Sequence, residues 1–284
     1  MIDIAIIGAG PAGLSAAING VIRNKTVKVF GNSSSTSYIY KAERVDNYMG
    51  MLGVTGKDMM DEFVNHAKEM GVPIQVGKVI EIFPMGDYYM LNVENEFIEA
   101  KTVILANGFS KGTVLEGENE FLGKGVSYCA TCDGPLYRGK TVAVIGDSNY
   151  AEEDANYLSE VCEKVYYMPQ YKDIKSLNAN VEVLEGKPKR ILGERVVQQI
   201  EFGGMHLEIS GVFIIKQNIP TAKLLKGLEM ENRAIKVNKF METNMKGVYA
   251  AGDSTGRPYQ VAKAIGEGNV AALQAVNYLH SFKK

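Results

Sequence analysis

The sequence predicts an α/β protein with two Rossmann-like, three-layer (ββα) domains, the second inserted into the first. An apolar strand at 4–7 runs into the turn GAGPAG, a helix of small residues and a second strand at 25–31. This order is the start of a βαβ unit. The same order recurs at 140–169. Two such units predict two domains rather than one long sheet.

The C-terminal segment indicates how the two domains are joined. Residues 247–284 form a strand, a Gly-Asp turn and a long helix of small residues, which is too little for a separate domain. We therefore expect one domain from 1–112 and 247–284, and an inserted domain from 113–246. Small residues at helical spacing predict the helix face that packs on the sheet: Ala262, Gly266, Val270, Ala271 and Ala275.

Composition argues against several classes of function. The 284 residues carry a net charge of -2, so no basic field favours nucleic acid as a partner. No apolar run reaches the ~20 residues of a membrane-spanning helix. The N-terminal residues lack the basic stretch of a signal peptide, so we expect a cytoplasmic protein with no membrane partner. Scattered histidines and three cysteines give no metal-ligand spacing, and we expect no metal site.

The first glycine-rich turn predicts a dinucleotide site. It fits G-x-G-x-x-G between a strand and a helix. Gly8 permits the tight turn, Gly10 lets the backbone approach a pyrophosphate, and Gly13 lets helix and strand pack closely. The acidic ribose ligand that usually follows the second strand is absent. Asn32 stands near that place and is suited to bond a ribose hydroxyl.

A second motif carries redox chemistry. Cys129 and Cys132 are separated by two residues and precede Asp133. Thiols at this spacing can close a small disulfide ring and suit thiol–disulfide exchange. Asp133 is placed to move a proton to or from a leaving thiolate. The third cysteine, Cys162, is expected to be a buried structural thiol.

GAGPAG, CATCDG and GVYAAGD, in this order and with an inserted second domain, resemble the low-molecular-weight thioredoxin reductases over essentially the whole chain. The resemblance implies that FAD binds the first domain and that the inserted domain carries a redox-active disulfide. Electrons would pass from flavin to disulfide to a thioredoxin-type protein. It also implies a homodimer and a rotation of the domains during turnover.

The resemblance assigns roles by position. Cys132 corresponds to the cysteine that reacts with flavin, Cys129 to the one that attacks the substrate, and Asp133 to the acid. The turn at 8–13 would hold the FAD pyrophosphate. The full set expected to bind the cofactor is Gly8, Gly10, Pro11, Ala12, Gly13, Asn32, Asn47, Ala106, Gly108, Gly252, Asp253, Gln260 and Val261.

The departures from the family all affect NADPH. Its second fingerprint, G-x-G-x-x-A, is here Gly-Asp-Ser-Asn-Tyr-Ala at 146–151. Its His-Arg-Arg run, which grips the 2′-phosphate, is Pro-Gln-Tyr at 169–171, and a glycine on the nucleotide's path is Gln217. An added side chain or like charge costs about 1–3 kcal/mol. We therefore expect NADPH binding to be weakened by orders of magnitude while the fold survives.

Another electron donor is then needed. The chain resembles the pyridine-nucleotide-independent thioredoxin reductases, in which reduced ferredoxin donates electrons. FAD suits such a donor because it accepts electrons singly and passes pairs to a disulfide. Basic clusters at 187–190 and 172–175 are candidates for steering an acidic ferredoxin. The alternatives are an NADPH-dependent reductase with an altered site, an FAD-dependent dithiol oxidase that uses oxygen, and a flavin redox sensor without enzymatic activity.

Overall fold

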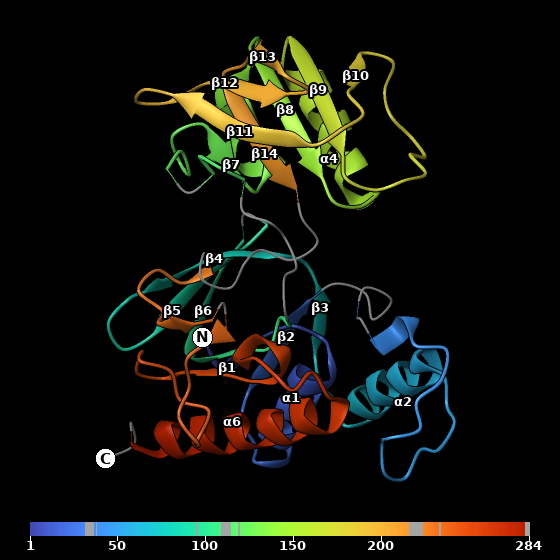
Figure 1. Cartoon of the computed structure of the whole chain (residues 1–284). Coiled ribbons are helices and arrows are strands. Elements are labelled where there is room, and N and C mark those ends of the chain that lie inside the picture. The colour runs from blue at the N-terminus through green and yellow to red at the C-terminus, as the bar shows by residue number, and fades with distance from the viewer. Residues whose placement is uncertain are drawn as a thin grey trace. The chain divides into compact units, whose positions relative to one another are not determined.

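The computed structural model of the chain (Figure 1) describes residues 1–31, 37, 39–94, 96–108, 115–118, 120–215, 224–232 and 234–281. The chain divides into two compact units, Met1–Ser110 with Pro220–Lys284, and Lys111–Ile219. Each contains a mainly or wholly parallel sheet with helices packed on it, which confirms the predicted fold class. Within the described ranges, no helix is both long and apolar enough to cross a membrane.

The first unit is built on one large sheet. Its helical elements are α1 (Pro11–Ile22), η2 (Ile39–Lys41), α2 (Gly56–Glu69), η4 (Gly252–Thr255) and α6 (Val261–Ser281). Its strands are β1 (Ile2–Ile7), β2 (Val27–Gly31), β3 (Ile74–Val76), β4 (Val79–Pro84), β5 (Tyr89–Val93), β6 (Glu96–Leu105), β15 (Met230–Glu231), β16 (Ala234–Ile235) and β17 (Val248–Ala250). Among the described residues, the sheet order is β3-β2-β1-β6-β5-β4, and β17 pairs with β6.

β1 is the central strand of this sheet. It runs parallel to β2 on one side and to β6 on the other, and β17 is also parallel to β6. Ile4, Ala5 and Ile6 of β1 are fully buried, as a continuous apolar strand requires when both faces of a parallel sheet are covered. The C-terminal ends of β1, β6 and β17 therefore meet at one edge.

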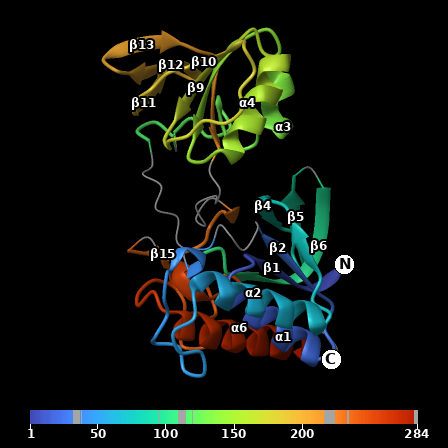
Figure 2. The same ribbon diagram turned by 90° about the vertical axis from the view of Figure 1, so that its right-hand side faces the viewer.

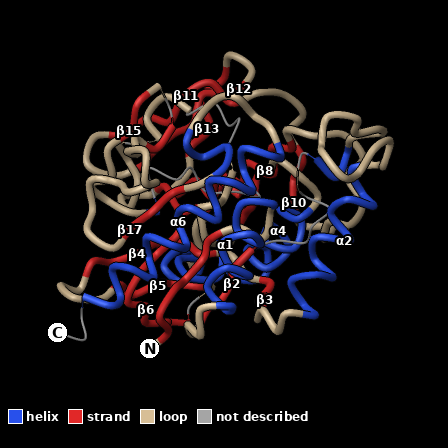
Figure 3. Tube along the Cα trace, turned by 90° about the horizontal axis from the view of Figure 1, so that it is seen from below, coloured by secondary structure: helices blue, strands red, loops and turns tan. Residues whose placement is uncertain are grey.

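Helices α1 and α6 pack side by side on one face of this sheet (Figures 2 and 3). The contact is close at Gly268, where an added Cβ would lie 2.1 Å from the carbonyl oxygen of Ala12. The buried face of α6 includes Ala264, Gly268, Ala271 and Ala275. The predicted face was partly wrong, because Ala262 and Gly266 are exposed. Small residues occur both on the exposed face of α6 and on the face that contains Gly268. The close contact with α1 determines that the face with Gly268 is the buried one.

The second unit has three layers. Its elements are β7 (Val126–Ser127), α3 (Ala130–Asp133), η3 (Gly134–Tyr137), β8 (Thr141–Gly146), α4 (Tyr150–Val161), β9 (Lys164–Pro169), β10 (Val181–Val183), β11 (Pro188–Gly193), β12 (Val197–Phe202), β13 (Met205–Glu208) and β14 (Gly211–Ile215). A parallel sheet of order β10-β9-β8-β14-β7 has α3 and α4 on one side and the antiparallel β11-β12-β13 sheet on the other (Figure 2).

The return boundary of the inserted domain differs from the expected position. The inserted domain is expected to extend to 246, whereas the described residues from 224 onward belong to the first unit. Leu225 is buried and forms a bridge with Ile82, and Glu242 pairs with Tyr249 of β17. Such short pairings leave no periodic pattern, so nothing in the local sequence indicates that the chain has already returned to the first unit.

The α1–α6 contact generates a stability prediction. We expect Gly268→Ala to destabilise the first unit by about 1–3 kcal/mol, because its methyl group meets backbone that cannot move aside cheaply. Gly266→Ala is the matched control in the same helix, since an added Cβ there meets no atom within 4 Å. It should be neutral or stabilising by up to ~1 kcal/mol. Urea denaturation followed by circular dichroism measures both, and equal midpoints would contradict the prediction.

Candidate functional site

The three glycines of the first turn, Gly8, Gly10 and Gly13, serve different structural purposes. Gly8 follows β1 with φ +117°, and an added Cβ would lie 2.2 Å from the carbonyl oxygen of Ala106. At Gly13 the Cβ would lie 1.8 Å from the oxygen of Gly8. At Gly10 it would meet no atom within 4 Å. Packing therefore requires glycine at Gly8 and Gly13, whereas Gly10 keeps a space open.

The start of α1 is suited to an anion. Gly10 is its N-cap and provides no side-chain hydrogen bond, Pro11 occupies the first turn, and that turn contains no acidic residue. The first amides of a helix lack intrahelical acceptors and carry partial positive charge. The residues present thus fit the diphosphate of a dinucleotide such as FAD.

The turn after β17 packs directly on α1. Gly252 has φ +80°, and its Cβ would lie 2.9 Å from that of Ala12. Asp253 is half-buried beside it. Burial raises the pKa of Asp253, the charge of Lys263 opposes this shift, and Glu267 adds to it.

A polar network that sequence reasoning missed holds this turn against α6. Lys263 Nζ has four acceptors at 2.9–3.0 Å: the carbonyl oxygens of Gly252 and Gly256, Thr255 Oγ1 and Glu267 Oε2. Glu267 Oε2 also accepts from the Gly252 amide at 2.9 Å. Both charged side chains are only 18% exposed. The Lys-to-Glu spacing of four residues was the available signal, but it is common on solvent-exposed helices.

Of the other residues predicted to bind the cofactor, Asn47, Ala106, Gly108 and Gln260 lie on loops of the same unit. Asn47 Nδ2 donates to Gln260 Oε1 at 2.8 Å, which joins two segments far apart in sequence, and Val261 begins α6. Ala106 is buried directly after β6, and Gly108 has φ +72°. Asn32 lies outside the described residues.

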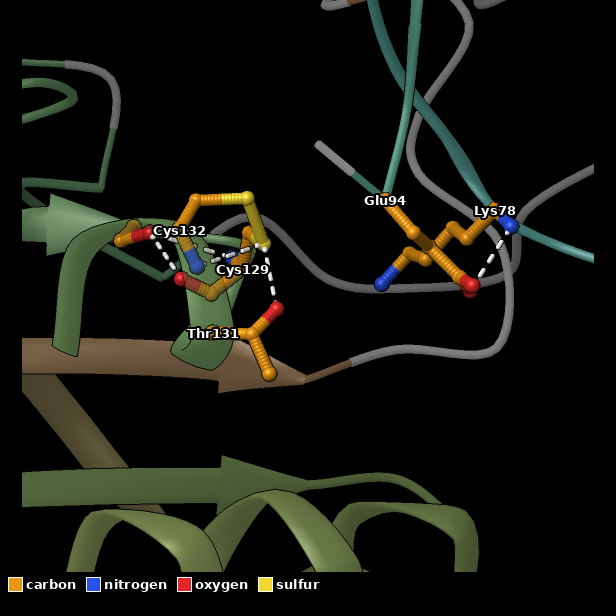
Figure 4. The surroundings of a disulfide bond; sticks show 6 residues. Lys78, Glu94, Cys129, Thr131 and Cys132 are labelled. Atoms are coloured by element: carbon orange, nitrogen blue, oxygen red, sulfur yellow. Dashed lines mark hydrogen bonds between the residues drawn. A yellow bond between two sulfur atoms is a disulfide. The ribbon is translucent and has the colours of Figure 1, made fainter. Parts of the chain in front are cut away.

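The cysteine pair forms a disulfide in the structure (Figure 4), with Cα atoms 5.3 Å apart. Cys129 is the N-cap of α3, and its sulfur accepts from the Cys132 amide at 3.2 Å. Thr131 Oγ1 lies 3.5 Å from the same sulfur. Because a disulfide sulfur carries no hydrogen, the hydroxyl is the donor. Cys129 is buried, and Cys132 is half-buried.

The backbone around the pair is fixed by buried polar contacts. Ser127 Oγ accepts from the Cys129 amide at 3.0 Å. Tyr128 donates its hydroxyl to the fully buried carboxylate of Glu118 at 2.6 Å. Burial and this contact raise the pKa of Tyr128. Gly134 lets α3 approach α4, since its Cβ would lie 3.0 Å from Leu158.

The remaining predicted residues of this region are placed as follows. Asp133 is half-buried and ends α3, directly after Cys132. Cys162 follows α4 and is half-buried, less buried than expected. Burial raises the pKa of the Cys162 thiol to about 11, so it is uncharged at neutral pH and unsuited to nucleophilic attack.

The second glycine-type turn keeps the strand–turn–helix path but has different contacts. Gly146 ends β8, and its Cβ would lie 2.6 Å from that of Ala151. Ser148 donates its hydroxyl to the Asp147 carboxylate at 3.2 Å. The first turn of α4 carries two acidic residues, Glu152 and Glu153, whereas the first turn of α1 carries none.

The positions where the family grips the 2′-phosphate are engaged within the chain. Gln170 Nε2 donates to the carbonyl oxygens of Pro169 and Gly186. Tyr171 donates its hydroxyl to Glu152 at 2.5 Å, and its oxygen lies 2.9 Å from that of Tyr167. Gln217 lies outside the described residues. Sequence reasoning did not identify Glu152, because an acidic residue in a first helical turn is common.

Comparison with known families defines the class. Residues 2–268 match the sequence pattern of the family described as Pyridine nucleotide-disulphide oxidoreductase, and the chain belongs to that family. With the disulfide in the second unit, the protein is a flavin-dependent enzyme that acts on disulfides.

Individual relatives narrow the class. Thioredoxin reductase from Aquifex aeolicus is 33% identical over 99% of this chain and 94% of that protein. The Helicobacter pylori enzyme is 32% identical over 98% and 99%, respectively. A crystal structure of a ferredoxin-flavin thioredoxin reductase from Clostridium acetobutylicum is 48% identical, covers 99% of this chain and 98% of that one, and gives a TM-score of 0.94. The protein is of the thioredoxin reductase type.

The open space at Gly10 generates a prediction for flavin binding. Gly10→Ala should cost at most ~1 kcal/mol of stability, because glycine is only a moderately better N-cap than alanine. It should weaken flavin affinity roughly tenfold or more, because its methyl group enters the space that a diphosphate needs. Flavin titration of the apoprotein and its thermal melting separate the two effects. Unchanged flavin affinity would contradict this assignment, and Gly13→Ala, which should lose both, is the comparison variant.

Proposed function

We propose that the protein is an FAD-dependent disulfide reductase that reduces thioredoxin through Cys129 and Cys132, with electrons from reduced ferredoxin rather than NADPH. One observation carries the choice of donor. The second unit keeps its Rossmann-type skeleton and its disulfide, yet the positions that would contact a nucleotide phosphate bear acids or bond within the chain. The reductase chemistry is kept while the family's usual electron source is not.

The two helix starts support this division of roles. At α1 the absence of acidic residues and of a side-chain cap favours a bound diphosphate. At α4 the negative charges of Asp147, Glu152 and Glu153 already offset the positive end of the helix, and they repel a dianionic ligand. FAD, when bound, supplies the chemistry that couples single-electron donation to two-electron disulfide reduction.

The chain's own residues account for the thiol chemistry. Two electrons and two protons convert the disulfide to a pair of thiols. The Cys132 amide and the Thr131 hydroxyl then stabilise negative charge on Cys129 Sγ. That thiolate attacks the substrate disulfide, a mixed disulfide forms, and Cys132 displaces the reduced substrate as the original disulfide closes again. Asp133 takes up the proton that Cys129 loses and passes it to the departing thiolate; the proton of Cys132 goes to the second thiolate as the disulfide closes. Because Cys129 is buried, turnover includes a movement that uncovers it.

The names of similar proteins support ferredoxin and thioredoxin as the proposed partners. The Clostridium acetobutylicum protein is described as a ferredoxin-flavin thioredoxin reductase, and the curated relatives include several thioredoxin reductases. Of the basic residues at 187–190, Lys189 and Arg190 both pair with Glu201, so this cluster has less free positive charge than its sequence indicates. A homodimer remains part of the proposal by resemblance, and the cytoplasmic location remains a prediction from the sequence.

The donor is tested anaerobically on the flavin-loaded protein. Reduced ferredoxin should generate thiols on thioredoxin, and micromolar NADPH should not bleach the flavin absorbance. Rapid bleaching by NADPH would overturn the proposed donor and favour the NADPH-dependent alternative. Oxygen uptake with small dithiols, without thioredoxin reduction, would favour the oxidase.

The cysteine roles are tested by substitution. Cys132→Ser should abolish turnover and leave Cys129 free to trap thioredoxin as a mixed disulfide on a non-reducing gel. Cys129→Ser should abolish both turnover and trapping. Cys162→Ser is the control and should keep the activity of the unaltered protein, since Cys162 lies outside the disulfide. Full activity of Cys132→Ser would contradict the assigned roles.

A further inference from the structure

Glu152 is a buried acid with no part in the thiol chemistry. Its side chain comes from the first turn of α4, and the residue is only 4% exposed. The carboxylate accepts from the Tyr171 hydroxyl at 2.5 Å, from the Ser176 amide at 2.7 Å and from the Lys175 amide at 3.1 Å. Burial alone would raise the pKa of Glu152, but these hydrogen bonds outweigh it and lower that pKa. The group is therefore a buried anion whose charge is stabilised by hydrogen bonds from the protein.

The donors around Glu152 are those that commonly bind phosphate. The successive backbone amides of Lys175 and Ser176 donate to the same carboxylate, as backbone amides do in many anion-binding sites, and the Tyr171 hydroxyl is a third donor. They lie on the loop after β9. In Rossmann-type domains the end of this second strand is where the adenosine ribose and its 2′-substituent are recognised. Here the same region binds a carboxylate of the chain itself.

We propose that Glu152 is a specificity-determining residue that excludes 2′-phosphorylated nucleotides, because its carboxylate occupies the donors that such a phosphate would use. The inference deepens the proposed function and rests on it, since it explains how the second unit avoids NADPH. The loss of the arginines and glycines removes favourable contacts with NADPH. The Glu152 carboxylate adds a second barrier, because it occupies donors that the 2′-phosphate would need. A competing phosphate has to displace a covalently tethered anion and leave it buried near a second negative charge.

The loop that supplies the donors has other anchors. Asn156 Nδ2 donates to the Ser176 carbonyl oxygen at 3.1 Å, and Asn156 Oδ1 accepts from the Asn178 amide at 2.8 Å. The buried Tyr167 holds the Tyr171 hydroxyl from the other side. Removal of the Glu152 carboxylate should therefore leave the donors near their present positions but without an acceptor.

The test compares Glu152→Ala with Glu153→Ala in the flavin-loaded, full-length protein. Both variants remove one acid from the same helical turn, but Glu153 is exposed. The probes are adenosine 2′,5′-bisphosphate and, separately, inorganic phosphate, titrated calorimetrically. We expect Glu152→Ala to bind adenosine 2′,5′-bisphosphate roughly tenfold or more tightly than the unaltered protein. Glu153→Ala removes an exposed charge but frees no donor, so its gain in affinity should be smaller. If Glu152→Ala also binds inorganic phosphate more tightly than the unaltered protein, the phosphate itself is the group that the freed donors recognise.

Hydrogen exchange gives a second measurement at the donors themselves. The amides of Lys175 and Ser176 should exchange faster in Glu152→Ala and slow down again when adenosine 2′,5′-bisphosphate is added. If Glu152→Ala unfolds, Glu152→Gln, which keeps the shape without the charge, should show a smaller gain of the same kind. Equal affinities in folded Glu152 and Glu153 variants would overturn the inference. NADPH bleaching of the unaltered protein would instead overturn the proposed donor, so the two failures are distinguishable.

Discussion

The close contact between α1 and α6 is the constraint on which the cofactor side of the molecule depends. Gly268 and Gly252 both lie against Ala12, so the first turn of α1, the turn after β17 and the last helix form one packed block. A side chain at Gly268 would push α6 away and carry Lys263 and Glu267 with it. These two residues hold the Gly252 turn through backbone atoms. Packing of small residues thus determines where the polar groups stand.

The two units show how one skeleton serves different electrostatic purposes. Both place a helix directly after the first strand of a βαβ unit, with glycine at the end of that strand. The first leaves its helix start open and uncharged, whereas the second surrounds it with acids. The backbone path is maintained by contacts among apolar residues, such as Ala151 against Gly146, so it survives when the ligand contacts change.

The sequence predicted the features that depend on local pattern. The strand–turn–helix units and the spacing of Cys129 and Cys132 are local, and the fold class followed from them. Features that depend on long-range pairing were missed or misplaced. The return to the first unit depends on Leu225 meeting Ile82, and the buried face of α6 depends on which stripe meets Ala12. Glu152 and Lys263 look like ordinary surface charges in sequence, and only the fold shows that their partners lie on other segments.

The hydrogen bonds of Glu152 also bear on how such a domain changes over evolution. Donors that a side chain of the protein satisfies remain satisfied at every metabolite concentration, so the loop after β9 needs no cofactor to complete its hydrogen bonds. If Glu152 excludes 2′-phosphorylated nucleotides as proposed, placing glycines at 146–151 and arginines at 169–171 would not by itself create a nucleotide site, because the Glu152 carboxylate would still occupy the donors. Two changes would then be needed together, new ligand contacts and removal of this carboxylate, and either change alone would leave the domain a carrier of the disulfide.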